Sequence, residues 1–122
     1  MEEIKYTVEF TKRFEQDVAF YRKKKKYYHI EDDIAPIIES LEKGELVGDE
    51  IPGISTTVGE HTYKVRAANT DTKTSKRDGY RVIYYAIQDD KTIFLLTVYS
   101  KKDDNRIPTN TEIIGIIEQY CS

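Results

Sequence analysis

The sequence predicts an α+β fold in which helices pack on one face of a mainly antiparallel, four-stranded sheet. Two kinds of spacing lead to this prediction. Four segments are strand-like, and in Ile4–Phe10 apolar and polar residues alternate, which is typical of a strand with one buried face. In three others apolar residues recur every three or four positions, as in amphipathic helices. The resulting order is one strand, two helices, three strands and one helix, and a single sheet with its helices on one side accommodates it most simply.

The N-terminal part predicts a strand followed by a helix. Residues Ile4–Phe10 alternate apolar and polar side chains, and Thr11 has the side chain of a helix N-cap. The helix runs into a basic stretch at Arg22–Lys26, where positive charge complements a helix C-terminus. The apolar stripe of this helix consists of Phe14, Val18 and Tyr21.

The second predicted helix has an apolar stripe but also contains a proline. Because Pro36 is tolerated in a first turn, we expect the regular helix to begin near Asp32 or Asp33. Gly44 is expected to follow its last residue, since glycine readily adopts the backbone conformation found there. The stripe consists of Ile30, Ile34, Ile37, Ile38 and Leu41.

The second half of the chain predicts the rest of the sheet. Strands are expected at Thr62–Ala68, Tyr80–Gln88 and Thr92–Ser100, with a tight hairpin link between the last two. Residues 45–59 are rich in Gly, Pro, Ser and Thr and predict a loop, while residues 69–79 predict a basic, mobile loop. Thr109 and Glu112 have the spacing of a capping box, which predicts the start of the last helix.

Length and composition fit one cytoplasmic domain spanning residues 1–122. A chain of 122 residues, 39% hydrophobic and 34% charged, can form a modest core without disulfides or metals. The single cysteine, Cys121, fits a reducing compartment. No apolar run resembles a signal peptide or is long enough to cross a membrane. His29 and His61 are the only histidines and lack metal-ligand spacing, so we expect no metal site and no cofactor.

The distribution of charge is the clearest functional signal from the residues themselves. Residues 61–102 contain nine basic and four acidic residues, a net charge of +5. The remainder contains ten basic and eighteen acidic residues, a net charge of −8. The chain therefore concentrates positive charge in one predicted sheet, although it is mildly acidic as a whole.

Strand alternation brings several of these basic residues to one face. If the helices cover the face formed by Val65, Val82 and Leu96, a polar set converges on the opposite, open face. Crowded cations repel one another unless an anion neutralises them, and phosphate is the obvious candidate because arginine can bind it through two parallel hydrogen bonds. The alternative is an ordinary solvated strand face, but acidic residues are expected only at the loop ends. The converging set is Lys64, Arg66, Arg81, Tyr99 and Lys101.

The same segment resembles the RelE/ParE superfamily of toxins from toxin–antitoxin systems. The matching run is YKVRAANTD…KRDGYRVIYYAIQDDKTIFLLTVYSKKD, and it is most similar to the HigB-like, RelE-type branch. The resemblance implies the RelE fold, with two N-terminal helices packed on one face of a twisted sheet and a C-terminal helix. It also implies ribosome-dependent, metal-independent cleavage of mRNA that inhibits translation, and neutralisation by a cognate antitoxin protein.

The resemblance also assigns residues to the expected site. Lys64 or Lys101 would transfer a proton, the two arginines would stabilise the phosphate, and Tyr99 would stack on a base or orient the phosphate. Tyr120 matches only loosely a C-terminal residue that some members use. The catalytic set is Lys64, Arg66, Arg81, Tyr99 and Lys101. The RNA-binding set is Lys73, Lys76, Arg77 and Lys102.

Two alternatives remain open from the sequence. The first is a ParE-like inhibitor of DNA gyrase, but that branch generally lacks the concentrated cationic set. The second is a catalytically silent module that binds antitoxin or nucleic acid. Both leading interpretations, the enzyme and the gyrase inhibitor, imply an antitoxin partner that covers the basic face or packs on the helices.

Overall fold

The computed structural model describes residues 5–54 and 58–120. Ile4, at the start of the predicted first strand, and Cys121 lie outside the described residues. In the described part of the chain, no helix is long and apolar enough to span a membrane. The elements are β1 (Thr7–Phe10), α1 (Lys12–Lys23), α2 (Ile30–Glu42), β2 (Asp49–Glu50), β3 (Glu60–Ala67), β4 (Tyr80–Ile87), β5 (Thr92–Ser100), the 3-10 turn η1 (Asp104–Arg106) and α3 (Asn110–Tyr120).

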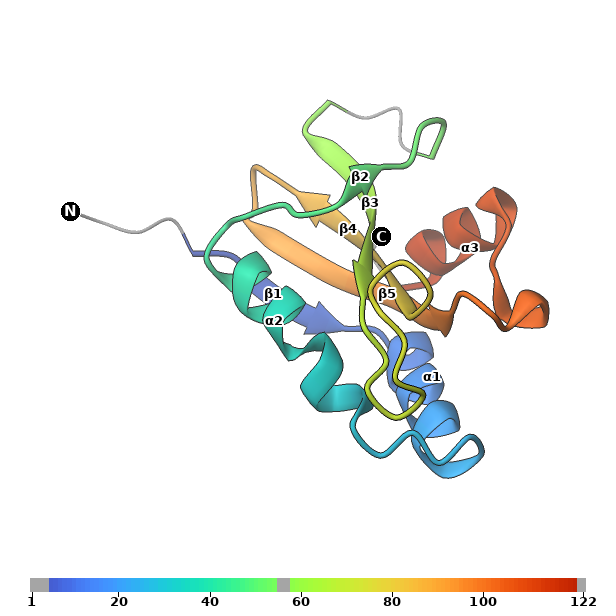
Figure 1. Cartoon of the computed structure of the whole chain (residues 1–122). Helices are drawn as coiled ribbons and strands as arrows, with labels where there is room; N and C mark the ends of the chain where they lie inside the picture. The colour runs from blue at the N-terminus through green and yellow to red at the C-terminus, as the bar shows by residue number, and fades with distance from the viewer. Residues whose placement is uncertain (1–4, 55–57, 121–122) are drawn as a thin grey trace.

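The strands form one mixed sheet in the order β1-β5-β4-β3-β2 (Figure 1). β1 runs parallel to β5, and every other neighbouring pair is antiparallel. The α+β class and the mainly antiparallel sheet are therefore confirmed. The expected number of four strands is wrong, because β2 adds a fifth. β2 has only two residues, both acidic, so it lacks the apolar alternation by which a strand is recognised.

Helices α1 and α2 cover one face of the sheet and build the larger core. Thr11 begins α1 as predicted, because its hydroxyl accepts a hydrogen bond from the Phe14 N–H at 3.1 Å. Tyr80, Val82, Tyr84 and Ala86 point alternately from β4 into this core. The buried helical residues that meet them are Phe14, Tyr21, Ile30, Ile34, Ile37 and Leu41.

Helix α2 begins at Ile30, earlier than expected, and Pro36 lies inside it. The prediction of a start near Asp32 or Asp33 is wrong. Pro36 and the residue four positions before it, Asp32, are both exposed, so water can replace the backbone hydrogen bond that proline cannot make. The expected end of the helix is confirmed, since Gly44 follows it with φ 84°.

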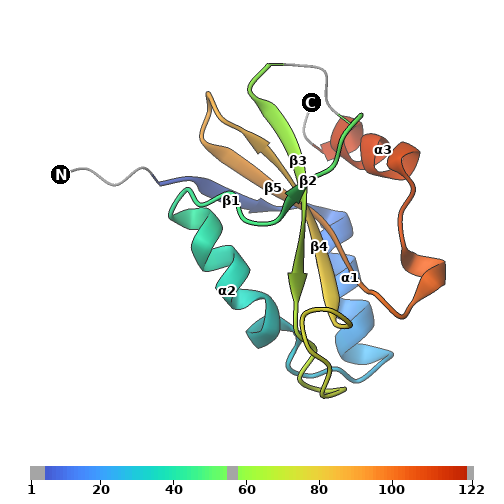
Figure 2. The same cartoon turned by 45° about the horizontal axis from the view of Figure 1, so that its top comes forward.

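Helix α3 packs on the opposite face of the sheet (Figure 2). Thr109 and Glu112 form the predicted capping box: the Glu112 N–H donates to Oγ1 of Thr109, and the Thr109 N–H donates to Oε1 of Glu112, both at 3.2 Å. Ile113 and Ile116 bury themselves against Ile83, Tyr85, Leu96 and Tyr99. The face that the sequence analysis left open is therefore partly covered.

A β-bulge in β5 changes which residues share a face. Ile83 pairs with Thr97 but the next residue, Tyr84, pairs with Leu95, so Leu96 is the additional residue. Leu96 packs on the α3 side, whereas Val98 belongs to the core beneath α1 and α2. The prediction that Val65, Val82 and Leu96 share one face is therefore wrong for Leu96. Thr97 likewise turns to α1, where its hydroxyl donates to Asp17.

Candidate nucleic-acid interface

One pocket of about 310 Å³ brings together all five residues of the expected catalytic set. They come from three strands and the residue that follows β5, and they share the lining with Asp49 and Ile107. We call this the cationic pocket. The lining residues from the expected set are Lys64, Arg66, Arg81, Tyr99 and Lys101.

Strand register explains why these residues meet. Arg66 on β3 pairs with Arg81 on β4, and Arg81 pairs with Tyr99 on β5, so the three lie in one row across the sheet. Lys101 continues from the end of β5, where its N–H donates to the Gly79 carbonyl at 2.9 Å. Two arginines directly opposite each other repel, which favours binding of an anion between them.

Arg81 lies at the floor of the pocket and is only 6% exposed. Its Nη1 donates to the carbonyls of Lys76 at 2.9 Å and Tyr80 at 3.1 Å, and its Nη2 donates to the carbonyl of Arg77 at 2.7 Å. Burial, and then the charge of Arg66, lower the pKa of Arg81. Arg81 therefore shapes the loop before β4 as well as adding positive charge. The sequence does not show these backbone contacts.

Tyr99 lines the pocket although the residue is almost completely buried. The residue is 5% exposed and packs in the cluster that contains Ile113 and Ile116. Burial raises the pKa of Tyr99, and the charge of Arg81 only partly offsets this effect. The hydroxyl consequently stays protonated at neutral pH and can donate a hydrogen bond. This geometry favours orientation of a phosphate over stacking on a base.

One carboxylate that the sequence analysis did not expect lies among the cations, and a second approaches from the end of the 69–79 loop. Asp49 is placed opposite Lys64 by the pairing of β2 with β3, and it lines the pocket. Asp78 approaches Lys101, with 3.7 Å between Oδ1 and Nζ. Both partners of that pair are well exposed, so it holds Lys101 only weakly. Asp49 was missed because its segment was interpreted as loop.

The residues of the expected RNA-binding set are exposed but lie outside the pocket lining. Lys76 instead lines a neighbouring groove of about 390 Å³, which also includes Arg66 and extends towards α2. Within the loop formed by residues 69–79, Asn69 and Thr74 form an antiparallel β-bridge that fixes the backbone between them. The set comprises Lys73, Lys76, Arg77 and Lys102.

Contacts with α2 hold the same loop from outside. Asp71 accepts hydrogen bonds from the His29 N–H at 2.9 Å and lies 2.8 Å from His29 Nδ1. The Thr70 N–H donates to Asp33 at 3.0 Å. The hydrogen bond with Asp71 raises the pKa of His29. The other histidine, His61, lies 2.8 Å from Glu50 and joins β2 to β3, outside the pocket lining.

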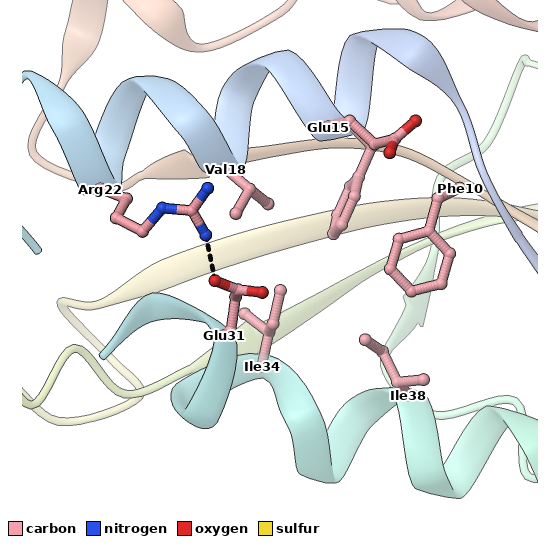
Figure 3. Close-up of a pocket in the computed structure, with 8 residues that line it drawn as sticks. Phe10, Glu15, Val18, Arg22, Glu31, Ile34 and Ile38 are labelled. Atoms are coloured by element: carbon pink, nitrogen blue, oxygen red, sulfur yellow. Dashed lines mark hydrogen bonds and ion pairs between the residues drawn. The ribbon is translucent and has the colours of Figure 1, made fainter. Parts of the chain in front are cut away.

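Another cavity, of about 400 Å³, lies between α1 and α2, and we call it the helical groove (Figure 3). Arg22 and Glu31 form an ion pair across it. Phe10, at the end of β1, is 47% exposed beside it. The other lining residues are Phe14, Glu15, Val18, Ile34 and Ile38. Among the residues that the structure describes, no group of three or more His, Cys, Asp or Glu side chains could hold a metal ion.

Comparison with known proteins identifies the fold. No protein-family model and no curated protein matches the sequence. A mutant of the E. coli toxin RelE in the free state is 16% identical, with a TM-score of 0.53 over 93% of this chain and 99% of that one. Isolated E. coli RelE is 18% identical, with a TM-score of 0.46 over 92% of this chain and 98% of that one. The RelBE2 toxin–antitoxin complex of Mycobacterium tuberculosis is 18% identical, with a TM-score of 0.42 over 84% of this chain and 98% of that one. The chain has the RelE toxin fold.

Proposed function

We propose that the protein is a HigB-like, RelE-type toxin of a toxin–antitoxin system that cleaves mRNA on the ribosome without a metal ion. The observation that carries the proposal is the convergence of Lys64, Arg66, Arg81, Tyr99 and Lys101 on one pocket. Inhibition of translation in the cytoplasm follows from this activity. The fold shared with E. coli RelE supports the proposal.

The chemistry uses the nucleophile that RNA itself carries. The 2′-oxygen attacks the adjacent phosphorus, the bond to the 5′-oxygen breaks, and a proton moves from the first oxygen to the second. Arg66 and Arg81 would stabilise the charge that grows on the phosphate oxygens. Lys64 or Lys101 would transfer the proton, and the Tyr99 hydroxyl would donate to the phosphate. The pocket would also hold the reacting atoms in line.

The exposed basic residues around the pocket would bind the RNA backbone on either side of the cleaved bond. Phosphate contacts of this kind position RNA without reading its sequence. The basic residues that would make these contacts are Lys73, Lys76, Arg77 and Lys102. The cognate antitoxin would neutralise the toxin with acidic residues over the cationic pocket or with apolar residues against the helices, because these two surfaces offer complementary contacts.

The test is cleavage of a defined mRNA by the purified protein, with and without programmed ribosomes. We expect cleavage only with ribosomes. The double variant Lys64→Ala/Arg66→Ala should lose at least about 10²-fold in rate, because it removes charge that acts in the transition state. Both residues are exposed, so the variant should stay folded.

Lys12→Ala provides the matched control, since Lys12 is an exposed lysine on α1 away from the pocket. Its cleavage rate should equal that of the wild type. Undiminished cleavage by the double variant would overturn the proposed site. Growth arrest without cleavage, accompanied by inhibited gyrase, would instead support the ParE-like alternative.

A further inference from the structure

The connection between β5 and α3 contacts the cationic pocket at two places. Lys101 lies at its start and Ile107 near its end, and both line the pocket. Between them the chain turns through η1, where the Asp103 N–H donates to Ser100 and the Arg106 N–H donates to Asp103, each at 2.9 Å. We call residues 101–107 the connecting segment. The residues between Lys101 and Ile107 therefore determine the positions of these two lining residues.

Asp17 of α1 holds the connecting segment through Arg106. Nη2 of Arg106 donates to Oδ1 of Asp17 at 2.9 Å. The Asp17 carboxylate is 2% exposed and also receives hydrogen bonds from Arg13, from the Thr97 hydroxyl and from the Val98 N–H. A buried carboxylate with this many donors fixes its partners in place.

Tyr21 and Phe20, on the same helix, add two further contacts. The Tyr21 hydroxyl donates to Asp103 at 3.2 Å and accepts from the Ser100 N–H at 2.9 Å. Burial raises the pKa of Tyr21, which keeps this hydroxyl protonated. The Arg106 guanidinium stacks on the Phe20 ring, with 3.7 Å between Cζ and the ring centroid. Asp103 and Arg106 are thus both held from α1.

These polar contacts are not needed to keep α1 on the sheet. Phe14 and the Tyr21 ring, both buried, already pack α1 against the core, and Thr11 fixes its start. A buried ion pair usually stabilises a fold no better than apolar residues of the same size would, but it can select one arrangement. The contacts therefore act mainly on the location of the connecting segment.

We propose that Asp17 and Tyr21 are positioning residues of the cationic pocket, which act through Arg106 and Asp103 to hold Lys101 and Ile107 beside Arg81 and Tyr99. The inference rests on the proposed function for its activity readout, and on the structure alone for its geometry. A helix on one side of the sheet would thereby set the shape of a site on the other. Loss of this hold should reduce turnover more than binding, because a misplaced catalytic group still attracts RNA.

The test compares Arg106→Gln with Arg22→Gln. Both changes remove an arginine–carboxylate contact of α1, but the Arg22 contact with Glu31 belongs to the helical groove. We expect Arg106→Gln to lower kcat for ribosome-dependent cleavage about 10- to 100-fold with KM nearly unchanged. Arg22→Gln should leave both constants as in the wild type. Arg106→Lys should restore part of the rate, since an ammonium group can still pair with Asp17.

Amide hydrogen exchange provides a readout that does not depend on cleavage. In Arg106→Gln the N–H groups of Asp103, Arg106 and Ile107 should lose protection, while those of β4 keep it. Tyr21→Phe, which removes one hydroxyl, should produce a smaller loss of protection at the same amides. This variant replaces Arg106→Gln in the test if Arg106→Gln does not fold.

Two results would overturn the inference. One is preserved protection of the connecting segment in Arg106→Gln and Tyr21→Phe. The other is lost protection with unchanged kcat. If the wild type itself does not cleave mRNA, the proposed function fails separately, and the exchange measurement still decides whether α1 holds the segment.

Discussion

The cationic pocket and the helical groove are similar in size but differ in what holds them together. The pocket, about 310 Å³, gathers charged side chains from neighbouring strands, and its arginines repel each other. The groove, about 400 Å³, is formed largely by apolar side chains of two helices and one ion pair. Strand register and backbone hydrogen bonds maintain the pocket, whereas apolar burial maintains the groove. Substitutions in the two regions should therefore affect different properties of the protein.

The largest effect on stability should come from the groove. Phe14 is 1% exposed, so Phe14→Ala should lower the free energy of unfolding by about 3–5 kcal/mol through lost burial and a new cavity. Urea unfolding measures this change. Phe10→Ala is the matched control, because Phe10 lies beside Phe14 but is 47% exposed and should cost clearly less. Equal losses for the two variants would contradict the assignment of Phe14 to the buried core.

An intermediate effect on stability is expected at Arg81, because this residue both carries charge and donates hydrogen bonds to the backbone. Arg81→Met removes three hydrogen bonds to backbone carbonyls and should lower the free energy of unfolding by about 1–3 kcal/mol. Arg66→Met, at the exposed partner in the same row, should leave it nearly unchanged. If the proposed function holds, both variants should also reduce cleavage of mRNA. A stable Arg81→Met variant would show that the loop before β4 does not depend on the guanidinium.

The smallest effect should arise at His29, which joins the basic loop to α2. Its pKa is raised above the ordinary value of 6.5, chiefly by the hydrogen bond with Asp71. The protonated form is therefore favoured in the folded protein, and the stabilisation is present below about pH 6.5 and lost as the pH rises through the raised pKa. After correction for intrinsic rates, the amide of Thr70 should exchange faster above that pKa than below it. In His29→Gln this dependence on pH should disappear; a wild type without it would refute the contact.

The row of cationic residues could be predicted from the sequence because strand alternation is a local property. Lys64 and Arg66 alternate with Tyr63 and Val65, and this spacing is enough to place the basic pair on one face. The starts of α1 and α3 were equally predictable, because Thr11 and the pair Thr109 and Glu112 bond to residues three positions away.

The features that could not be predicted depend on contacts between distant parts of the chain. Leu96 changes face because β5 contains one residue more than β4 requires, and no local spacing reveals this bulge. Asp49 enters the pocket only through pairing of a two-residue strand with β3. The burial of Tyr99 depends on where α3 packs. None of these features leaves a periodic pattern in the sequence.

The parallel pairing of β1 with β5 has a consequence for biosynthesis. Thr7 pairs with Thr92, 85 residues later, so β1, the first of the described strands, waits for β5, the last of them, before it gains its neighbour. Contacts between such distant residues form late, since closing the intervening chain costs entropy. Lys101 and Ile107 leave the ribosome later still. A nascent chain should therefore acquire its native sheet, and with it the row from Arg66 to Tyr99, only after β5 has left the ribosome.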